Sequence, residues 1–181
     1  MSGTRKKPRE KRDSMHNELT ASDIKKMEEE IEYRKLVVRK NALEDVKEAR
    51  AQGDLSENFE YYAAKKFKNQ NESRIRYLER MIKTATVISE DSKEDEVGMN
   101  NSVEVLFEED GSVETYRIVT TVRGNSLEGL VSNESPIGKA LLGHKVGDRV
   151  CVEVNPTYSY YLVIRKIDKT NDDSLDKLRS F

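Results

Sequence analysis

The sequence predicts an α+β protein: an N-terminal antiparallel α-helical hairpin of the coiled-coil type, followed by a small antiparallel β-sheet domain with one short helix. The helical half is predicted by residues 21–51 and 55–84, which contain neither glycine nor proline and repeat apolar residues at helical spacing. Gly53 separates the two runs. The sheet is predicted by a change of pattern near residue 87, after which short β-branched or aromatic segments alternate with turn signals.

The composition excludes several classes of protein. The 181 residues carry 32 Lys and Arg against 34 Asp and Glu, and 36% of them are charged, which is typical of long solvated helices. No apolar run reaches the roughly 18–20 residues that span a bilayer. The basic N-terminus has no apolar stretch behind it, so we expect no secretory signal. The single cysteine, Cys151, excludes an intramolecular disulfide and a CxxC metal site. We therefore expect a soluble, cytoplasmic chain.

The charges are segregated along the chain. Residues 1–12 and 65–83 are strongly basic, whereas residues 89–110 hold nine carboxylates and one lysine. Such blocks favour oriented docking on a charged partner. Each block is equally compatible with an ordinary solvated face.

The first half of the chain divides into a tail and a hairpin. Residues 1–18 lack apolar periodicity, so we expect a disordered basic tail. The hairpin domain spans residues 19–86, and its two helices, 21–51 and 55–84, reach roughly 45 Å at 1.5 Å per residue. Arg34 interrupts the apolar stripe of the first helix. The two stripes consist of Ile24, Met27, Ile31, Val38, Ala42, Val46 and Ala49 in the first helix and Ala64, Phe67, Ile75, Leu78 and Ile82 in the second.

The second half is expected to be a sheet domain over residues 87–168, followed by a polar tail over 169–181. Asp110-Gly111 is a strong hairpin-turn signal. Ser135-Pro136 predicts the start of a short helix that ends before Gly143, because proline is favoured at the first helical position. The expected strands are Ser102–Phe107, Val113–Val119, Leu127–Ser132, Asp148–Val154 and Tyr158–Ile167.

The connection between the two helices holds the densest candidate site. Asp54 and Glu57 are three residues apart, so both carboxylates can face the same way at the start of the second helix. Mg²⁺ is commonly held by one or two carboxylates, with waters and a substrate phosphate as the other ligands. Two carboxylates are therefore too few to bind the ion tightly, but they suit lending ligands to an ion in another protein's active site. The same spacing also fits a capping box that only starts the helix, and both interpretations remain open on spacing alone.

Motifs in both halves of the chain resemble a known family. The hairpin connection reads Ala49-Arg50, then Gly53-Asp54-Leu55-x-Glu57-Asn58-x-Glu60-Tyr61, then Ala63-Ala64-Lys65. The second half contains Tyr116-Arg117-Ile118-Val119, Ser132-Asn133-Glu134-Ser135-Pro136-Ile137-Gly138-Lys139-Ala140-Leu141-Leu142-Gly143 and Val146-Gly147-Asp148. In this order, over about residues 19–168, these motifs resemble the bacterial transcript-cleavage factors of the GreA/GreB family, and the second set favours a GreA-like member.

The resemblance implies a function. Factors of this family bind bacterial RNA polymerase, insert the coiled coil into its secondary channel and stimulate Mg²⁺-dependent cleavage of backtracked nascent RNA at its 3′ end. The chain would then not be an enzyme itself, and the isolated chain would bind no cofactor tightly. It would be a monomer and would not associate with membranes. The sheet domain would have an FKBP-like fold.

The resemblance also implies roles for six residues in and next to the connection between the two helices. Asp54 and Glu57 would be the metal-assisting carboxylates, sharing Mg²⁺ with the polymerase site. Arg50 and Lys65 would contact the RNA. The tip would be supported by Asn58 and Tyr61.

This sequence departs from the family pattern at three positions. Lys65 stands where the family often has arginine, which keeps the charge but loses the bidentate fork. Ser56 and Phe59 stand where lysine and alanine are frequent.

Other functions are also compatible with the sequence. A Gre-like protein could plug the channel and inhibit the polymerase without stimulating cleavage, and a coiled-coil adaptor would need the tip only as a helix cap. A prolyl isomerase is disfavoured, because residues 88–168 carry no signature of an aromatic-lined pocket.

Four groups outside the connection receive structural interpretations. We expect His16 and His144 to be surface residues and Cys151 to be a small core residue. Tyr158, Tyr160 and Tyr161 could stack on bases, but strand packing is favoured because no basic cluster is interleaved with them.

Overall fold

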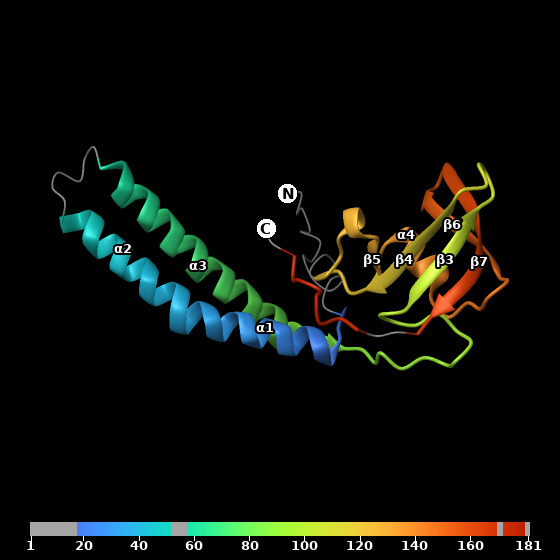
Figure 1. The fold of residues 1–181 in the computed structure, drawn as a ribbon, viewed down its shortest axis with the longest axis horizontal. Helices are drawn as coiled ribbons and strands as arrows, with labels where there is room; N and C mark the ends of the chain where they lie inside the picture. The colour runs from blue at the N-terminus through green and yellow to red at the C-terminus, as the bar shows by residue number, and fades with distance from the viewer. Residues whose placement is uncertain (1–17, 52–57, 170–171, 180–181) are drawn as a thin grey trace, which may run out of the picture. The chain divides into compact units, whose positions relative to one another are not determined.

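The computed structural model describes residues 18–51, 58–169 and 172–179 and divides into two compact units. The hairpin unit is Ser22–Ala85. The sheet unit comprises the described residues up to Ala21 and those from Thr86 onward. Figure 1 shows the ribbon of each unit. The predicted α+β class, a helical hairpin followed by a sheet with one short α-helix, is confirmed.

The hairpin unit contains α1 (Ala21–Tyr33), a π-helical turn η2 (Arg34–Val38), α2 (Arg39–Ala51) and α3 (Phe59–Thr84). All seven apolar positions expected in the first helical run are buried or half-buried, so its stripe is confirmed. The π-turn lies where Arg34 interrupts the stripe, and the amide of Arg39 donates to the carbonyl of Arg34, five residues back. Such a turn holds an extra residue and is a recognised cause of a local change in helix direction.

A polar layer replaces the apolar contact at the π-turn. Arg74 of α3 forms two hydrogen bonds to the Glu30 carboxylate, at 2.9 and 3.1 Å, and Arg34 donates to the same carboxylate at 2.6 Å. Asn71 accepts from the Arg34 side chain at 3.1 Å and donates to the Arg34 carbonyl at 3.3 Å. Burial raises the pKa of Glu30, but the hydrogen bonds and charges of Arg74 and Arg34 outweigh it, so the pKa lies below its ordinary value.

The polar layer corrects the stripe expected for the second helix. Ile75 and Leu78 are buried as predicted, but Phe67 is 49% exposed. The buried positions next to them are Asn71 and Arg74. The side chain of Phe67 is solvent-exposed, and the buried contacts at Asn71 and Arg74 are ion pairs and hydrogen bonds instead of apolar packing.

The sheet unit is built on a five-stranded sheet of order β5-β4-β3-β7-β6. Two strands have the predicted bounds, β3 (Ser102–Phe107) and β4 (Val113–Val119), and β6 (Arg149–Asn155) and β7 (Tyr158–Asp168) differ by one residue at their ends. The expectation of a wholly antiparallel sheet is wrong, because β5 (Leu130–Ser132) runs parallel to β4. The residues predicted to begin this strand instead belong to a 3₁₀ turn, η3 (Ser126–Glu128). This turn lies in the connection between β4 and β5, which must return the chain to the end of the sheet where β4 begins because the two strands are parallel.

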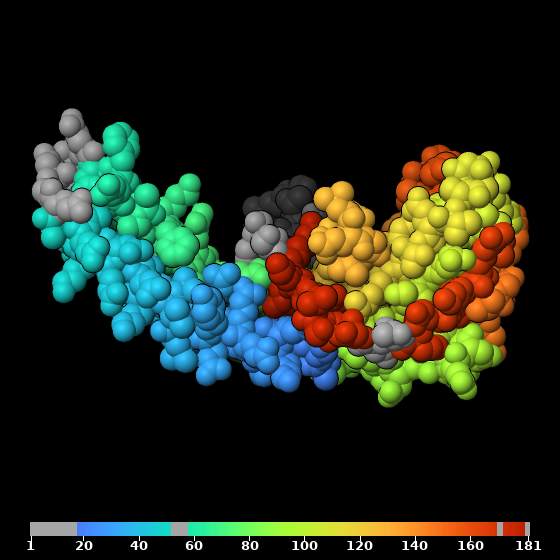
Figure 2. All heavy atoms as spheres, viewed as in Figure 1, coloured from blue at the N-terminus to red at the C-terminus, as the bar shows by residue number. Residues whose placement is uncertain are grey.

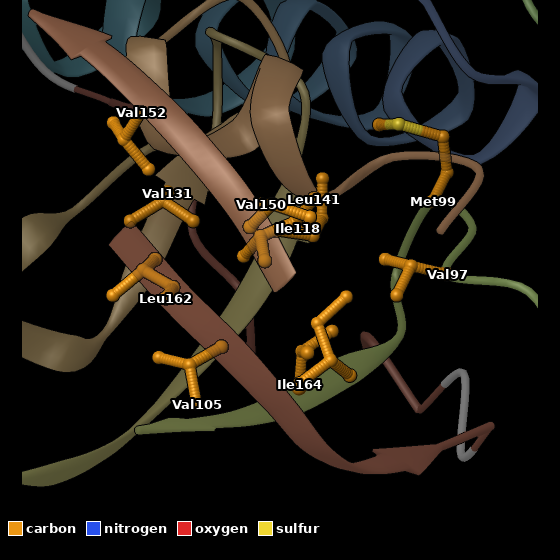
Figure 3. Packing of buried hydrophobic residues seen from close by; sticks show 11 residues of the cluster. Val97, Met99, Val105, Ile118, Val131, Leu141, Val150, Val152, Leu162 and Ile164 are labelled. Atoms are coloured by element: carbon orange, nitrogen blue, oxygen red, sulfur yellow. The ribbon is translucent and has the colours of Figure 1, made fainter. Parts of the chain in front are cut away.

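The short helix α4 (Pro136–Leu141) begins as the sequence predicts. Ser135 is its N-cap and accepts a hydrogen bond from the Gly138 amide at 3.1 Å. A Cβ at position 138 would lie 2.1 Å from the carbonyl oxygen of Ser132, so only glycine allows the helix to approach this closely. Leu141 of α4 thereby packs with Ile118 and Val150 in the core of the sheet unit (Figure 3).

Strand alternation corrects the prediction for Cys151. Val150 and Val152 of β6 are buried in the core, and Cys151 between them is exposed. Successive strand residues point to opposite faces, so the two valines and the cysteine cannot share the core.

Both predicted tails differ from expectation where the structure describes them. Glu18, assigned to the N-terminal tail, forms β1 (Glu18–Leu19), which pairs in parallel with β2 (Thr86–Val87). Residues 172–179, assigned to the polar tail, contact the sheet unit through hydrogen bonds and ion pairs. None of the described helices is long and apolar enough to cross a bilayer.

We predict that Glu30→Gln lowers the free energy of unfolding by about 1.5–3 kcal/mol, because it removes the charge that two arginines share. Urea unfolding followed by circular dichroism measures the change. Glu28→Gln, on an exposed position of the same helix, is the matched control and should alter stability by less than about 0.5 kcal/mol. Equal stability of the two variants would contradict the role of the polar layer.

The same pair of proteins makes a pH prediction. A carboxylate with a depressed folded-state pKa stabilises the fold above its unfolded pKa, and the contribution is lost as the pH falls through the folded value. The ordinary pKa of Glu30 is 4.5. We therefore expect the stability difference between wild type and Glu30→Gln to be constant above that pH and to narrow below it, and a difference independent of pH would be inconsistent with the depressed pKa.

Candidate functional site at the hairpin tip

The candidate site lies where α2 ends and α3 begins, at one end of the hairpin unit (Figure 1). The two candidate metal-assisting carboxylates, Asp54 and Glu57, lie outside the described residues. The described part of the tip comprises the last turn of α2 and the first turns of α3, and it contains the other four candidates. These are Arg50, Asn58, Tyr61 and Lys65.

Asn58 joins the two helices of the hairpin. Its side-chain oxygen accepts a hydrogen bond from the amide of Tyr61 at 2.9 Å, which makes it the N-cap of α3. Its side-chain nitrogen donates to the carbonyl of Ala49, in the last turn of α2, at 2.7 Å. One amide group therefore satisfies a free N–H at the start of one helix and a free C=O at the end of the other.

This geometry decides part of the question that spacing left open. Helix α3 begins at Phe59, not near Leu55 as expected, and its N-cap position is filled by Asn58. The hypothesis that Asp54 caps this helix is therefore wrong, because a helix has one N-cap residue.

Tyr61 brings together the two candidate RNA-binding cations. Arg50 donates to the Tyr61 hydroxyl at 3.5 Å, and its guanidinium carbon lies 5.8 Å from the ring centroid. The Lys65 ammonium also lies 5.8 Å from that centroid. The hydrogen bond from Arg50, followed by the charge of Lys65, lowers the pKa of the Tyr61 hydroxyl. Cations contributed by both helices thus converge on one aromatic ring.

Two aromatic side chains at the tip are solvent-exposed. Phe59, the first residue of α3, is 87% exposed, and Tyr62 is 54% exposed. The ring of Tyr62 contacts that of Tyr61 edge-on, with 5.7 Å between centroids. Phe59 departs from the family pattern, and its sequence position alone predicted no role for it. The available signal was a large aromatic residue beside the connection, off the apolar stripe of the second helix.

The described side chains of the tip can bind an anion, and they include no cluster of metal-ligand type. Arg50 and Lys65 offer a fork and a point charge to phosphate oxygens. Among the described residues, no group of three or more His, Cys, Asp or Glu side chains is placed to hold a metal.

The remaining candidates outside the tip take structural positions. His144 is exposed and lies 3.1 Å from the Asp148 carboxylate, as expected for a surface residue, and His16 lies outside the described residues. Tyr160 stacks on Phe107 at 5.8 Å between centroids and is half-buried against the core, which confirms strand packing for this residue. The guanidinium carbon of Arg149, on the neighbouring strand β6, lies 3.6 Å from the ring centroid of Tyr161.

We predict that Asn58→Ala accelerates hydrogen exchange of the Tyr61 amide and destabilises the hairpin by about 1–2 kcal/mol, because both the cap and the bond to Ala49 are lost. Asn58→Asp retains a cap acceptor but has no donor for the Ala49 carbonyl. It should therefore protect the Tyr61 amide nearly as well as wild type while remaining less stable. If Asn58→Ala leaves exchange at Tyr61 unchanged, the cap assignment is wrong.

Both halves of the chain match a known family. Residues 17–87 match the GreA/GreB family model described as "Transcription elongation factor, N-terminal", and residues 91–169 match the one described as "Transcription elongation factor, GreA/GreB, C-term". The transcription elongation factor GreA of Geobacillus kaustophilus (strain HTA426) is 47% identical over 136 residues, which are 75% of this chain and 86% of that protein.

A second curated protein and a solved structure are also similar to this chain. The transcription elongation factor GreA of Bacillus subtilis (strain 168) is 43% identical over 135 residues, covering 75% of this chain and 86% of its own length. Among solved structures, GreA factor homolog 1 (Gfh1) of Thermus thermophilus is 27% identical, with a TM-score of 0.38, over 83% of this chain and 97% of that chain.

Proposed function

The chain belongs to the GreA/GreB family of transcription elongation factors, and from this premise we propose that it binds bacterial RNA polymerase and stimulates cleavage of backtracked nascent RNA. The helical hairpin would enter the secondary channel with its tip toward the polymerase active site. The chain would act there as a cytoplasmic monomer. Cleavage would remain the chemistry of the polymerase, and this chain would activate it.

One observation at the tip supports the proposal most. Arg50 and Lys65 come from different helices and converge on Tyr61, directly beside the connection that contains the two carboxylates. The two cations that would hold a phosphate flank Asp54 and Glu57 in the sequence. The tip thus combines groups that bind an RNA backbone with groups that prefer Mg²⁺.

The chemistry of the connection fits a shared magnesium ion. Because Asn58 fills the N-cap position of α3, the start of this helix does not require the Asp54 carboxylate. We propose that Asp54 and Glu57 would hold Mg²⁺ together with ligands from the polymerase, since two carboxylates are too few to hold it alone. When bound, the ion would polarise a water molecule and stabilise negative charge on the scissile phosphate.

The residues around the carboxylates would position them. The hydrogen bond of 2.7 Å from the Asn58 side-chain nitrogen to the Ala49 carbonyl oxygen holds the two ends of the connection together. Tyr61 restrains Arg50 and Lys65, whose long side chains would otherwise lose more conformational entropy on binding RNA.

We predict that Asp54→Asn and Glu57→Gln each reduce stimulated cleavage by about 10–100-fold or more. Substituting a residue that only hydrogen-bonds to a metal ligand already costs this much, and these two residues would be ligands themselves. Polymerase binding should be retained, because the amides have nearly the same size. Cleavage assays on stalled complexes and a parallel binding assay measure the two quantities. Stimulation of cleavage by the Asp54→Asn protein at the wild-type level would exclude the metal role. Failure of the unsubstituted chain to stimulate cleavage would instead favour a channel-binding inhibitor or an adaptor.

A second prediction concerns the basic residues of the tip. Lys65→Glu should lower RNA crosslinking and cleavage by up to about fivefold, and the defect should shrink as salt is raised. Lys66→Glu carries the same charge change on the adjacent exposed residue and is the matched control. If the two variants behave alike, the net charge of the hairpin rather than a contact of Lys65 determines the effect.

A further inference from the structure

The C-terminal segment, defined as residues 172–179, occupies a pair of arginines on the sheet unit. Arg117 lies on β4 and Arg123 in the connection that follows it. The family match ends at residue 169, so the segment is an addition to the domain that carries both arginines. Figure 2 shows the segment in red on the surface of the molecule.

Two aspartates of the segment contact the arginines directly. The Asp176 carboxylate accepts from Arg117 at 3.1 Å and from Arg123 at 2.9 Å. Asp173 accepts from Arg123 at 3.4 Å. In this arrangement the Arg123 side chain is fully buried and that of Asp176 is only 8% exposed.

The main chain of the segment is also bound. Arg117 donates to the carbonyl of Asp172 at 2.6 Å, and the amide of Arg179 donates to the carbonyl of Val122 at 2.7 Å. The site therefore recognises a peptide backbone at both ends, with two carboxylates three residues apart between them. A nucleic acid offers phosphates but neither of these backbone groups.

The segment has no regular secondary structure of its own, and polar contacts hold it on the sheet unit. It contains no helix or strand, and Leu175 is 90% exposed. Ion pairs of this kind are partly offset by desolvation, so another ligand with the same groups can replace them.

We propose that Arg117 and Arg123 form a docking site for an acidic peptide, and that the C-terminal segment is its intramolecular occupant. A partner protein with two carboxylates three residues apart in a non-helical stretch displaces the segment. Because the segment is tethered, it competes at a high effective concentration. The displacing partner is therefore one already held by another part of the chain, which raises its own effective concentration in the same way.

The probe for this site is a fluorescein-labelled peptide with the sequence of residues 172–179. The full-length chain carrying Asp173→Asn and Asp176→Asn should bind it at least about tenfold more tightly than wild type does, because its own segment no longer competes. Binding should weaken as salt is raised. A labelled peptide that carries Asp173→Asn and Asp176→Asn should bind at least about tenfold more weakly, and it serves as the matched control.

Two further arms keep the proposal falsifiable. Arg117→Lys and Arg123→Lys, added to the aspartate variant, retain charge but lose the planar fork and should weaken peptide binding. In wild type, excess unlabelled peptide should accelerate hydrogen exchange of the Arg179 amide, a readout that needs no substitution. The proposal is overturned if the folded aspartate variant binds both peptides equally, or if a labelled RNA oligonucleotide binds the opened site more tightly than the acidic peptide.

Discussion

The tip of this protein depends on the register between the two arms of the hairpin, α1 with α2 on one side and α3 on the other. An apolar stripe permits sliding by a turn, whereas a buried polar pair specifies one alignment. Glu30 of α1 is bound by Arg74 of α3, and Asn71 of α3 is bound by Arg34 at the start of the π-turn. A slip of one helical turn, 5.4 Å, would break all of these contacts at once. The polar layer thus selects the alignment in which Asn58 reaches the carbonyl of Ala49.

The same alignment places charge at the tip. Arg50 is in the last turn of α2 and Lys65 is in the second turn of α3, and they meet at Tyr61 only when the helices are in this register. The hairpin is consequently more than a spacer. Its interior polar contacts determine which residues border the Asp54 and Glu57 connection. Partly buried contacts, such as Arg39 to Glu72 at 2.6 and 2.7 Å, also join the two arms of the hairpin.

Local sequence patterns predicted the elements well where local chemistry decides. The bounds of β3 and β4 followed from alternation around Asp110-Gly111, and the start of α4 followed from its serine cap and proline. Long-range pairing decided the rest. The parallel direction of β5, the polar layer at Asn71 and the docking of Asp176 each join residues far apart in the chain, and composition carries no signal for such partners.

The candidate site was predicted by a different route. Spacing alone left Asp54 and Glu57 undecided between a metal and a cap, and the resemblance to a family identified the tip as functional. The structure adds that Asn58 fills the N-cap position of α3 and also bonds to Ala49, a partnership no spacing rule predicts.

The central claim is that the tip carboxylates lend ligands to a magnesium ion in the polymerase site, and the Mg²⁺ dependence of RNA cleavage tests it most directly. A ligand added to the site strengthens metal binding, so the factor should lower the half-saturating Mg²⁺ concentration for cleavage by stalled polymerase by about tenfold or more. A Glu57→Gln chain, bound to the polymerase to the same extent, should leave that concentration where it is without any factor. Stimulation of cleavage at an unchanged Mg²⁺ requirement would contradict the account.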